Sequence, residues 1–143
     1  MFKIKKSLSV LFFLGISVSA AFAGAAELEK ALSLLNENKT DAAIEIIKGQ
    51  IQANPNISDN YLAMGLAQIE KNDYSGAKEN FQQALSINKK IVAAHYMLAM
   101  IYEKDGDAPQ AIDKWQKIIK YSKNDVLKDL AKKHIKQLQE EIK

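Results

Sequence analysis

The sequence predicts an all-α fold of stacked helical hairpins, on three observations: a repeat of about 34 residues, a fixed pattern of small and bulky columns, and turn signals that recur in phase. The first small column holds Ala31, Gly65 and Ala99, the second holds Ala43, Ala77 and Ala111, and the bulky column holds Ile47, Phe81 and Trp115. We expect the small columns to lie where two helices approach closely, with the bulky residues between neighbouring helices.

The composition argues against several classes of function. A chain of 143 residues allows one ordinary domain, and the absence of cysteine excludes disulfides and thiolate metal sites. The two histidines, His95 and His134, fall in separate predicted helices, where we expect them to pack rather than bind a metal. No Gly-rich phosphate loop and no nucleophile beside a base are present. We therefore expect no enzymatic activity, no metal and no cofactor.

Charge is unevenly distributed along the chain. The formal net charge of +3 comes from Lys3, Lys5 and Lys6, and the rest is neutral. Residues 24–88 hold five lysines and nine acids, a net of −4, whereas residues 89–143 hold twelve lysines and eight acids, a net of +4. This polarity is consistent with a solvated lysine-rich face or with oriented association of molecules. All the basic residues are lysines, and we expect no nucleic-acid partner.

Residues 1–23 have the pattern of a secretory signal peptide. Three lysines precede an apolar stretch, Leu8 to Val18, and Ala21-Phe22-Ala23 supplies the small residues of a cleavage site. We expect cleavage after Ala23 or Ala25, which makes the mature protein periplasmic or secreted. The alternative is an uncleaved membrane anchor, because residues 7–26 carry no charge over a length that just spans a bilayer.

The first predicted repeat covers residues 24–57. Leu28, Ala31, Leu32 and Leu35 fall at helical spacing, and a second helix is expected from about Asp41 to Ala53. Pro55 then ends it, because proline lacks the N–H that continues a helix. This first copy is the least regular of the three, as is typical of a terminal repeat.

The second repeat covers residues 58–91 and the third covers 92–123. We expect Ser58 to cap the first helix of the second repeat, Asn72 to end that helix, and Asp73 to cap the next. Gly106 and Asp107 have the same positions in the third repeat. Pro109 follows in the first turn of a helix, where its missing donor costs little.

Residues 124–143 are predicted to form one further helix, capped by Asn124 and with an apolar stripe that includes His134. We expect Asp129 and Lys133 to pair on its exposed side. This helix is expected to cover the open end of the third repeat, because the last interface of a repeat stack otherwise faces water.

The columns resemble those of the tetratricopeptide repeat. The second copy carries the resemblance furthest, through Tyr61, Met64-Gly65, Tyr74, Ala77, Phe81 and Ala84-Leu85. The third matches through Leu98-Ala99, Tyr102, Ala111, Trp115 and Ile118, and the first mainly through Ala31, Ala43, Ile47 and Pro55. The resemblance implies a right-handed α-solenoid of three repeats with a C-terminal capping helix.

By the same resemblance, the first helix of each repeat lines a groove that binds a protein or peptide partner. The residues that the resemblance assigns to this groove are Leu28, Leu32, Leu35, Asp59, Leu62, Leu66, Ile69, Tyr96, Met100 and Glu103. The positions of the chaperone-binding carboxylate clamp hold Leu28, Leu32, Ala63, Ala93 and Met97, so that specificity is not expected.

The function that the sequence favours is an exported, non-enzymatic adaptor that holds a partner segment in this groove. One alternative is a scaffold that associates with itself through its oppositely charged ends, or whose groove is filled by its own last helix or a second copy. The other is the same module held at a membrane by residues 4–23.

Overall fold

The computed structural model describes residues 25–142, and this part of the chain is all-α. It contains α2 (Ala25–Asn36), α3 (Thr40–Ala53), α4 (Ser58–Glu70), α5 (Tyr74–Ile87), α6 (Val92–Asp105), α7 (Ala108–Tyr121) and α8 (Asp125–Glu141). The helical-repeat fold is confirmed. None of these helices is both long enough and apolar enough to cross a bilayer. The expected signal peptide lies outside the described residues.

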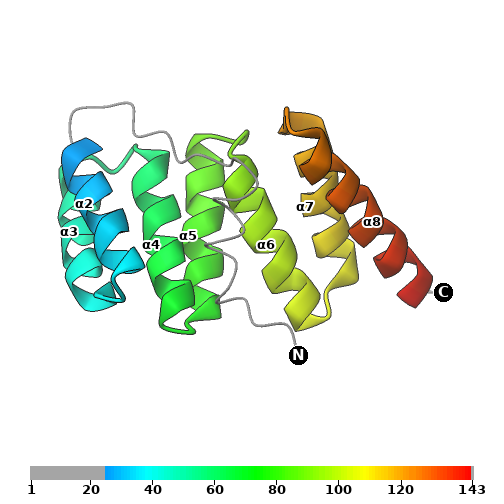
Figure 1. Ribbon diagram of the computed structural model, residues 1–143, viewed down its shortest axis with the longest axis horizontal. Helices are drawn as coiled ribbons and strands as arrows, with labels where there is room; N and C mark the ends of the chain where they lie inside the picture. Colours follow the sequence, from blue (N-terminus) through cyan, green and yellow to red (C-terminus); the bar gives the residue numbers. More distant parts are fainter. Residues whose placement is uncertain (1–24, 143) are drawn as a thin grey trace. The chain divides into compact units, whose positions relative to one another are not determined.

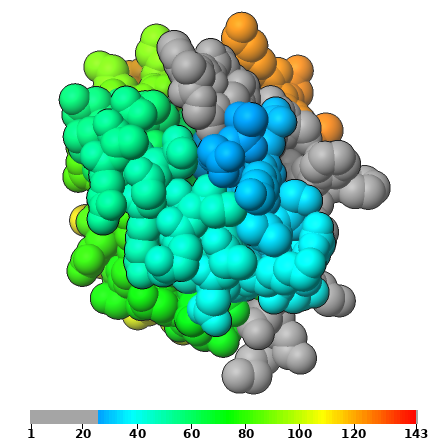
Figure 2. Space-filling view, turned by 90° about the vertical axis from the view of Figure 1, so that its left-hand side faces the viewer, coloured from blue at the N-terminus to red at the C-terminus, as the bar shows by residue number. Residues whose placement is uncertain are grey.

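The described helices fall into two compact units, with the division between Lys89 and Lys90. One unit contains α2 to α5, which form two consecutive antiparallel hairpins (Figure 1). Within it α2 packs on α3, α3 on α4 and α4 on α5, and the two first helices, α2 and α4, also touch. Figure 2 shows α2 and α3 side by side on the surface of this unit.

The small and bulky columns form the centre of this unit. Ala31, Ala43 and Ala77 are fully buried, as are Ile47 and Phe81. Gly65 lies directly against the Phe81 ring, so that a Cβ built on Gly65 would come within 2.5 Å of a ring carbon. The expected packing of small residues against the neighbouring helix is therefore confirmed here, with glycine where the approach leaves no room for a methyl group.

The second unit contains α6, α7 and α8, in which α7 packs on both α6 and α8. Ala99, Ala111 and Trp115 are fully buried. Every residue of α6 from Ala93 to Tyr102 is buried, so this helix has no exposed stripe over nearly three turns. A helix that is apolar on all sides is expected to be enclosed in this way.

The three turns within the hairpins have the same backbone geometry. Asn38, Asn72 and Gly106 each adopt a left-handed conformation, with φ of 60°, 61° and 75°. Glycine and asparagine are the residues that tolerate this conformation best, because other side chains clash with the backbone there. The turns predicted at Asn72 and Gly106 are confirmed, and Asn38 has the same left-handed conformation in the first hairpin.

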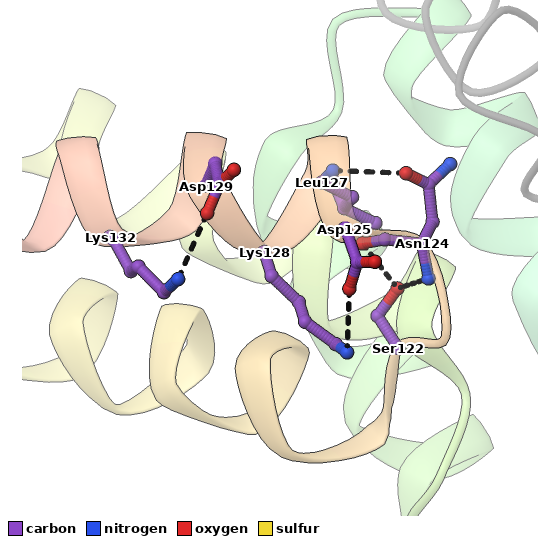
Figure 3. A network of polar contacts seen from close by, with 7 residues as sticks. All are labelled: Ser122, Asn124, Asp125, Leu127, Lys128, Asp129 and Lys132. Atoms are coloured by element: carbon purple, nitrogen blue, oxygen red, sulfur yellow. Dashed lines mark hydrogen bonds and ion pairs between the residues drawn. The ribbon is translucent and has the colours of Figure 1, made fainter.

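Side-chain caps follow two of these turns and begin α8. The Asp73 carboxylate accepts from the Gly76 N–H at 2.9 Å, and that of Asp107 from the Gln110 N–H at 3.2 Å. Asn124 Oδ1 accepts from the Leu127 N–H in the same way (Figure 3). Three of the four predicted side-chain caps, those of Asp73, Asp107 and Asn124, are confirmed. In the first hairpin the equivalent residue is Lys39, which makes no side-chain cap.

Two local predictions are wrong. Ser58 does not cap α4, because Ile57 occupies the cap position and the Ser58 hydroxyl instead lies 3.5 Å from the Asp59 carboxylate. Asp129 pairs with Lys132 at 2.9 Å rather than with Lys133 (Figure 3). Lys133 is exposed, and it stands 34 residues after Ala99, in the column that the earlier first helices fill with small residues.

Candidate functional site

In the unit of α2 to α5, most of the predicted groove residues are buried. Leu28, Leu35, Leu62, Leu66 and Ile69 are each at most 4% exposed. Leu32 on α2 and Asp59 on α4 are partly exposed. No contact in the structure tests partner binding at these positions, so the groove stays a prediction, and Leu32 and Asp59 are its accessible members in this unit.

The start of α4 holds a carboxyl group in an unfavourable setting. Burial raises the pKa of Asp59, and the hydrogen bond from the Ser58 hydroxyl offsets this only in part. The next residue, Asn60, is 3% exposed, and its amide Nδ2 has no acceptor among the described residues. A half-buried acid and an unsatisfied buried donor both cost free energy, which is typical of positions kept for binding.

The three other predicted groove residues lie in the unit of α6 to α8. Tyr96 and Met100 are buried, and the Glu103 side chain is 22% exposed. Burial, and secondly the negative charge of Glu103, raise the pKa of the Tyr96 hydroxyl. Glu103 therefore faces the interior of this unit and does not stand at an open edge.

Glu103 is at the centre of a polar and aromatic cluster that sequence reasoning missed. Its Oε1 accepts from the indole Nε1–H of Trp115 at 2.5 Å and lies 2.8 Å from Nδ1 of His134. The Trp115 and His134 rings stack with their centroids 4.3 Å apart, and Tyr96 meets Trp115 edge-on at 5.5 Å. One signal in the sequence points to this cluster: a histidine stands on the apolar stripe of the last helix.

The other histidine takes a packing position, as expected. His95 is 4% exposed, and its ring stacks on Tyr121 of α7 with centroids 5.8 Å apart. Within residues 25–142 no three histidine or acidic side chains gather closely enough to hold a metal ion. The described part of the chain thus contains no constellation that suits a metal centre.

Ion pairs on α7 and α8 reduce the local effect of the C-terminal lysines. Lys114 contacts Asp113, Lys128 contacts Asp125 and Lys132 contacts Asp129, at 2.8–3.0 Å. The last two pairs follow one another along the first turns of α8 (Figure 3). A surface of such pairs presents a weaker positive field than the count of lysines implies.

Two models of the family described as tetratricopeptide repeat match the chain, over residues 58–91 and residues 80–113. The first match spans α4 and α5, and the second runs from α5 through α6 into α7. The matched segments, which together cover residues 58–113, are similar to tetratricopeptide repeats. Such repeats generally mediate protein–protein interaction, and proteins built from them are typically non-enzymatic.

Two curated proteins show similarity to parts of this repeat chain. The tetratricopeptide repeat and J domain-containing co-chaperone DNJ1 of Cryptococcus neoformans var. grubii is 32% identical over 84 residues, which are 59% of this chain and 16% of the co-chaperone. Superkiller complex protein 3 of Mus musculus is 28% identical over 71 residues, which are 50% of this chain and 4% of that protein. The chain therefore spans less than a fifth of the length of either relative.

Proposed function

We propose that this chain is a non-enzymatic adaptor that holds a segment of a partner protein against the first helices of its repeats. The observation that carries the proposal is the start of α4, where Asp59 is half buried at a position that the repeat pattern assigns to binding. The name of the related co-chaperone, which contains the same kind of repeat, agrees with an interaction role.

The chemistry of the accessible positions restricts the partner. Leu32 on α2 offers apolar contact, and Asp59 on α4 offers a carboxylate whose charge is poorly solvated. The repeat pattern assigns both positions to one groove, and the helices that carry them, α2 and α4, are in contact. This combination suits an amphipathic or extended segment that places a lysine or arginine next to an apolar side chain.

A crosslinking pulldown with a paired variant tests this surface. We expect Leu32→Glu combined with Asp59→Lys to lose the partners that the unchanged chain captures, because the pair removes the apolar contact and reverses the charge. Leu62 and Leu66 are unsuitable for this test, since both are 2% exposed and a charge there would disrupt the fold.

The matched control is Ser33→Glu combined with Glu79→Lys, which makes the same kinds of charge change at exposed positions of α2 and α5. Circular dichroism must show equal helicity in both double variants. Capture of the same partners by both would contradict the proposal, whereas loss by the first variant alone supports it.

We propose further that the chain is exported and that residues 1–23 are removed, giving a periplasmic or secreted protein. The basic start, apolar stretch and small-residue site support this. The intact mass of the protein from cells should correspond to a start at Gly24 or Ala26. Recovery from the membrane fraction with residues 1–23 still present would instead favour the anchored alternative.

A further inference from the structure

The first helices of the unit of α2 to α5 carry carboxylates beside the positions assigned to the groove. On α2, Glu29 and Leu32 are three residues apart, so their side chains are neighbours on the helix surface. On α4, Glu70 follows Leu66 by four residues, and Asp59 is in the first turn. The two helices are in contact. We call these five residues the first-helix face.

The first-helix face is acidic and contains no lysine. Glu29 is exposed, and Asp59 and Glu70 are partly exposed. Among the described residues of this unit, the ion pairs join lysines to other acids, on α3 and in the turn before it. Three carboxylates therefore stand beside a partly exposed leucine without a cation of their own. A segment that suits this face brings positive charge next to apolar side chains.

The chain itself contains such a segment, in the part that lies outside the described residues. Lys3, Lys5 and Lys6 are followed by an uncharged, mostly apolar stretch from Leu8 to Val18. Residues 1–24 include no acid, so nothing within the segment offsets the three positive charges. The segment thus has the composition that the first-helix face lacks, with three lysines for three carboxylates.

The point of attachment brings this segment to the face. Residue 24 is joined to Ala25, the first residue of α2, and Glu29 is little more than one turn further along. The 13 residues of α4 extend over about 20 Å. Residues 7–24 would span about 27 Å as a helix and up to about 60 Å when extended. In either conformation, Lys6 can reach the carboxylates at both ends of α4.

We propose that residues 1–24, while they remain attached, occupy the first-helix face and close it to partner proteins. The apolar stretch packs against Leu32 and its neighbours, and the three lysines pair with the carboxylates. Because the segment is tethered, its effective concentration at the face is about 1 mM, so that weak contacts are sufficient. Removal of the segment opens the face. This inference rests on the proposed function, because it concerns control of the same groove.

Disulfide trapping in the full chain tests the contact. The chain has no cysteine, so an introduced pair gives an unambiguous bond. Ser9→Cys is combined either with Leu32→Cys on the face or with Glu79→Cys at an exposed position of α5. Cell-free synthesis without membranes keeps residues 1–23 attached. We expect the pair with Leu32→Cys to form the intrachain disulfide several-fold faster, although position 79 is the more exposed of the two. Intact mass after mild oxidation is the measurement.

A second comparison tests the charges. Asp59→Asn combined with Glu70→Gln should slow trapping between positions 9 and 32 at low salt, because two of the three carboxylates are neutralised. The matched control is Asp41→Asn combined with Glu45→Gln, which removes two charges from exposed positions of α3. That control should leave the rate of trapping unchanged.

Equal trapping at positions 32 and 79 would overturn the proposal, and so would equal rates in the two charge variants. Disulfide-linked dimers formed through position 32 would assign the face to a second copy and would overturn it as well. None of these results bears on the adaptor function, because capture of partners is measured on the processed chain with the paired variants described above.

Discussion

At the scale of single residues, Gly65 shows how closely the two helices of the second hairpin approach. A Cβ built there would lie 2.5, 2.7 and 2.9 Å from three carbons of the Phe81 ring. Contacts under 3.0 Å require a shift of the neighbour, and Phe81 is fully buried with little room to move. The glycine is therefore a packing requirement of α4 against α5.

We expect Gly65→Ala to lower the free energy of unfolding by about 1–3 kcal/mol, the usual cost of overpacking a filled core. The control is Gly49→Ala on α3, where a Cβ would meet nothing within 4 Å. That change should stabilise the chain by roughly 0.5–1 kcal/mol, because alanine is the better helix former. Urea unfolding followed by circular dichroism measures both, and equal effects of the two changes would contradict this packing account.

Asp59 should make stability depend on pH in a particular sense. Burial raises the pKa of this carboxyl, so the fold favours its neutral form. The stabilisation it provides is complete below the ordinary pKa of an aspartate and is lost as the pH rises through the raised value in the folded chain. We therefore expect Asp59→Asn to be more stable than the unchanged chain at pH 7.

At about pH 3 that difference should disappear, because aspartate is largely protonated there in both states. Glu79→Gln removes one negative charge at an exposed position of α5 and serves as the control for net charge. Chemical unfolding at the two pH values is the measurement. If Asp59→Asn is less stable at pH 7, the carboxylate is favourably held, and its proposed role as a strained binding group is wrong.

Single residues also show where sequence reasoning ends. The buried states of Phe81 and Trp115 followed from periodicity, because the repeat places them in one column. The Glu103–His134 pair joins residues 31 apart, and the Asp41–Lys71 ion pair of 2.5 Å joins residues 30 apart. Neither separation corresponds to a helical or a repeat spacing, so only the packing of the helices brings these partners together.

At the scale of the helices, the starts of α3, α5 and α7 differ in one respect. All three follow a left-handed turn residue, and the cap residues Lys39, Asp73 and Asp107 have similar backbones, with φ between −92° and −84°. Asp73 and Asp107 each accept an N–H of the first turn, whereas Lys39 cannot. The first hairpin thus lacks a cap for which its backbone is already arranged.

Lys39→Asp should therefore stabilise the chain by about 0.5–2 kcal/mol, the range measured for N-cap residues. The change removes the Lys39–Glu37 pair, but both side chains are more than half exposed, and such pairs contribute little. Thermal and urea unfolding provide the measurement. Lys39→Ala is the control, because it removes the same pair without adding a cap and should leave stability almost unchanged.

The converse prediction concerns removal of a cap. Asp73→Ala should cost about 1 kcal/mol, because the Gly76 N–H loses its acceptor. Ser58→Ala should cost much less, since the Ser58 hydroxyl does not cap α4. Comparable losses from the two changes in urea unfolding would mean that Ser58 has a capping role in solution. The sequence alone could not distinguish the roles of Ser58 and Asp73, because serine and aspartate are both good N-cap residues. The structure distinguishes them: Asp73 precedes the first residue of α5, whereas Ser58 is itself the first residue of α4.

At the scale of the whole molecule, the opposite net charges of residues 24–88 and 89–143 bear on self-association. The division between the two compact units falls one residue later, between Lys89 and Lys90. Several lysines of α7 and α8 are already paired with neighbouring acids. Exposed charges separated by more than about 10 Å are also largely screened at 0.1 M salt.

We therefore expect a monomer in sedimentation velocity from about 0.05 M to 0.5 M salt, because screening at these ionic strengths leaves little attraction between the oppositely charged segments of two molecules. The measurement is the sedimentation coefficient over a tenfold range of protein concentration. Association at low salt that is reversed at high salt would contradict this and would favour the scaffold alternative.

Most of the architecture was predictable, and most of the accessible surface was not. The period of 34, the turn residues and the small columns determine the number and order of the helices through local conformation and close packing. Accessibility depends on how helices cover one another: Leu66 and Leu32 hold the same position in their repeats, yet Leu66 is 2% exposed and Leu32 is partly exposed. A periodic pattern cannot distinguish them.

The exposed lysine in the column of Ala31, Gly65 and Ala99 has a consequence for assembly. A second chain that docked on α8 as closely as α7 docks on α6 would trap the ammonium group of Lys133 in a dry contact, at a large cost in hydration. Close docking on that face of α8 therefore has to dehydrate one charged side chain, at the position where α2, α4 and α6 have alanine or glycine.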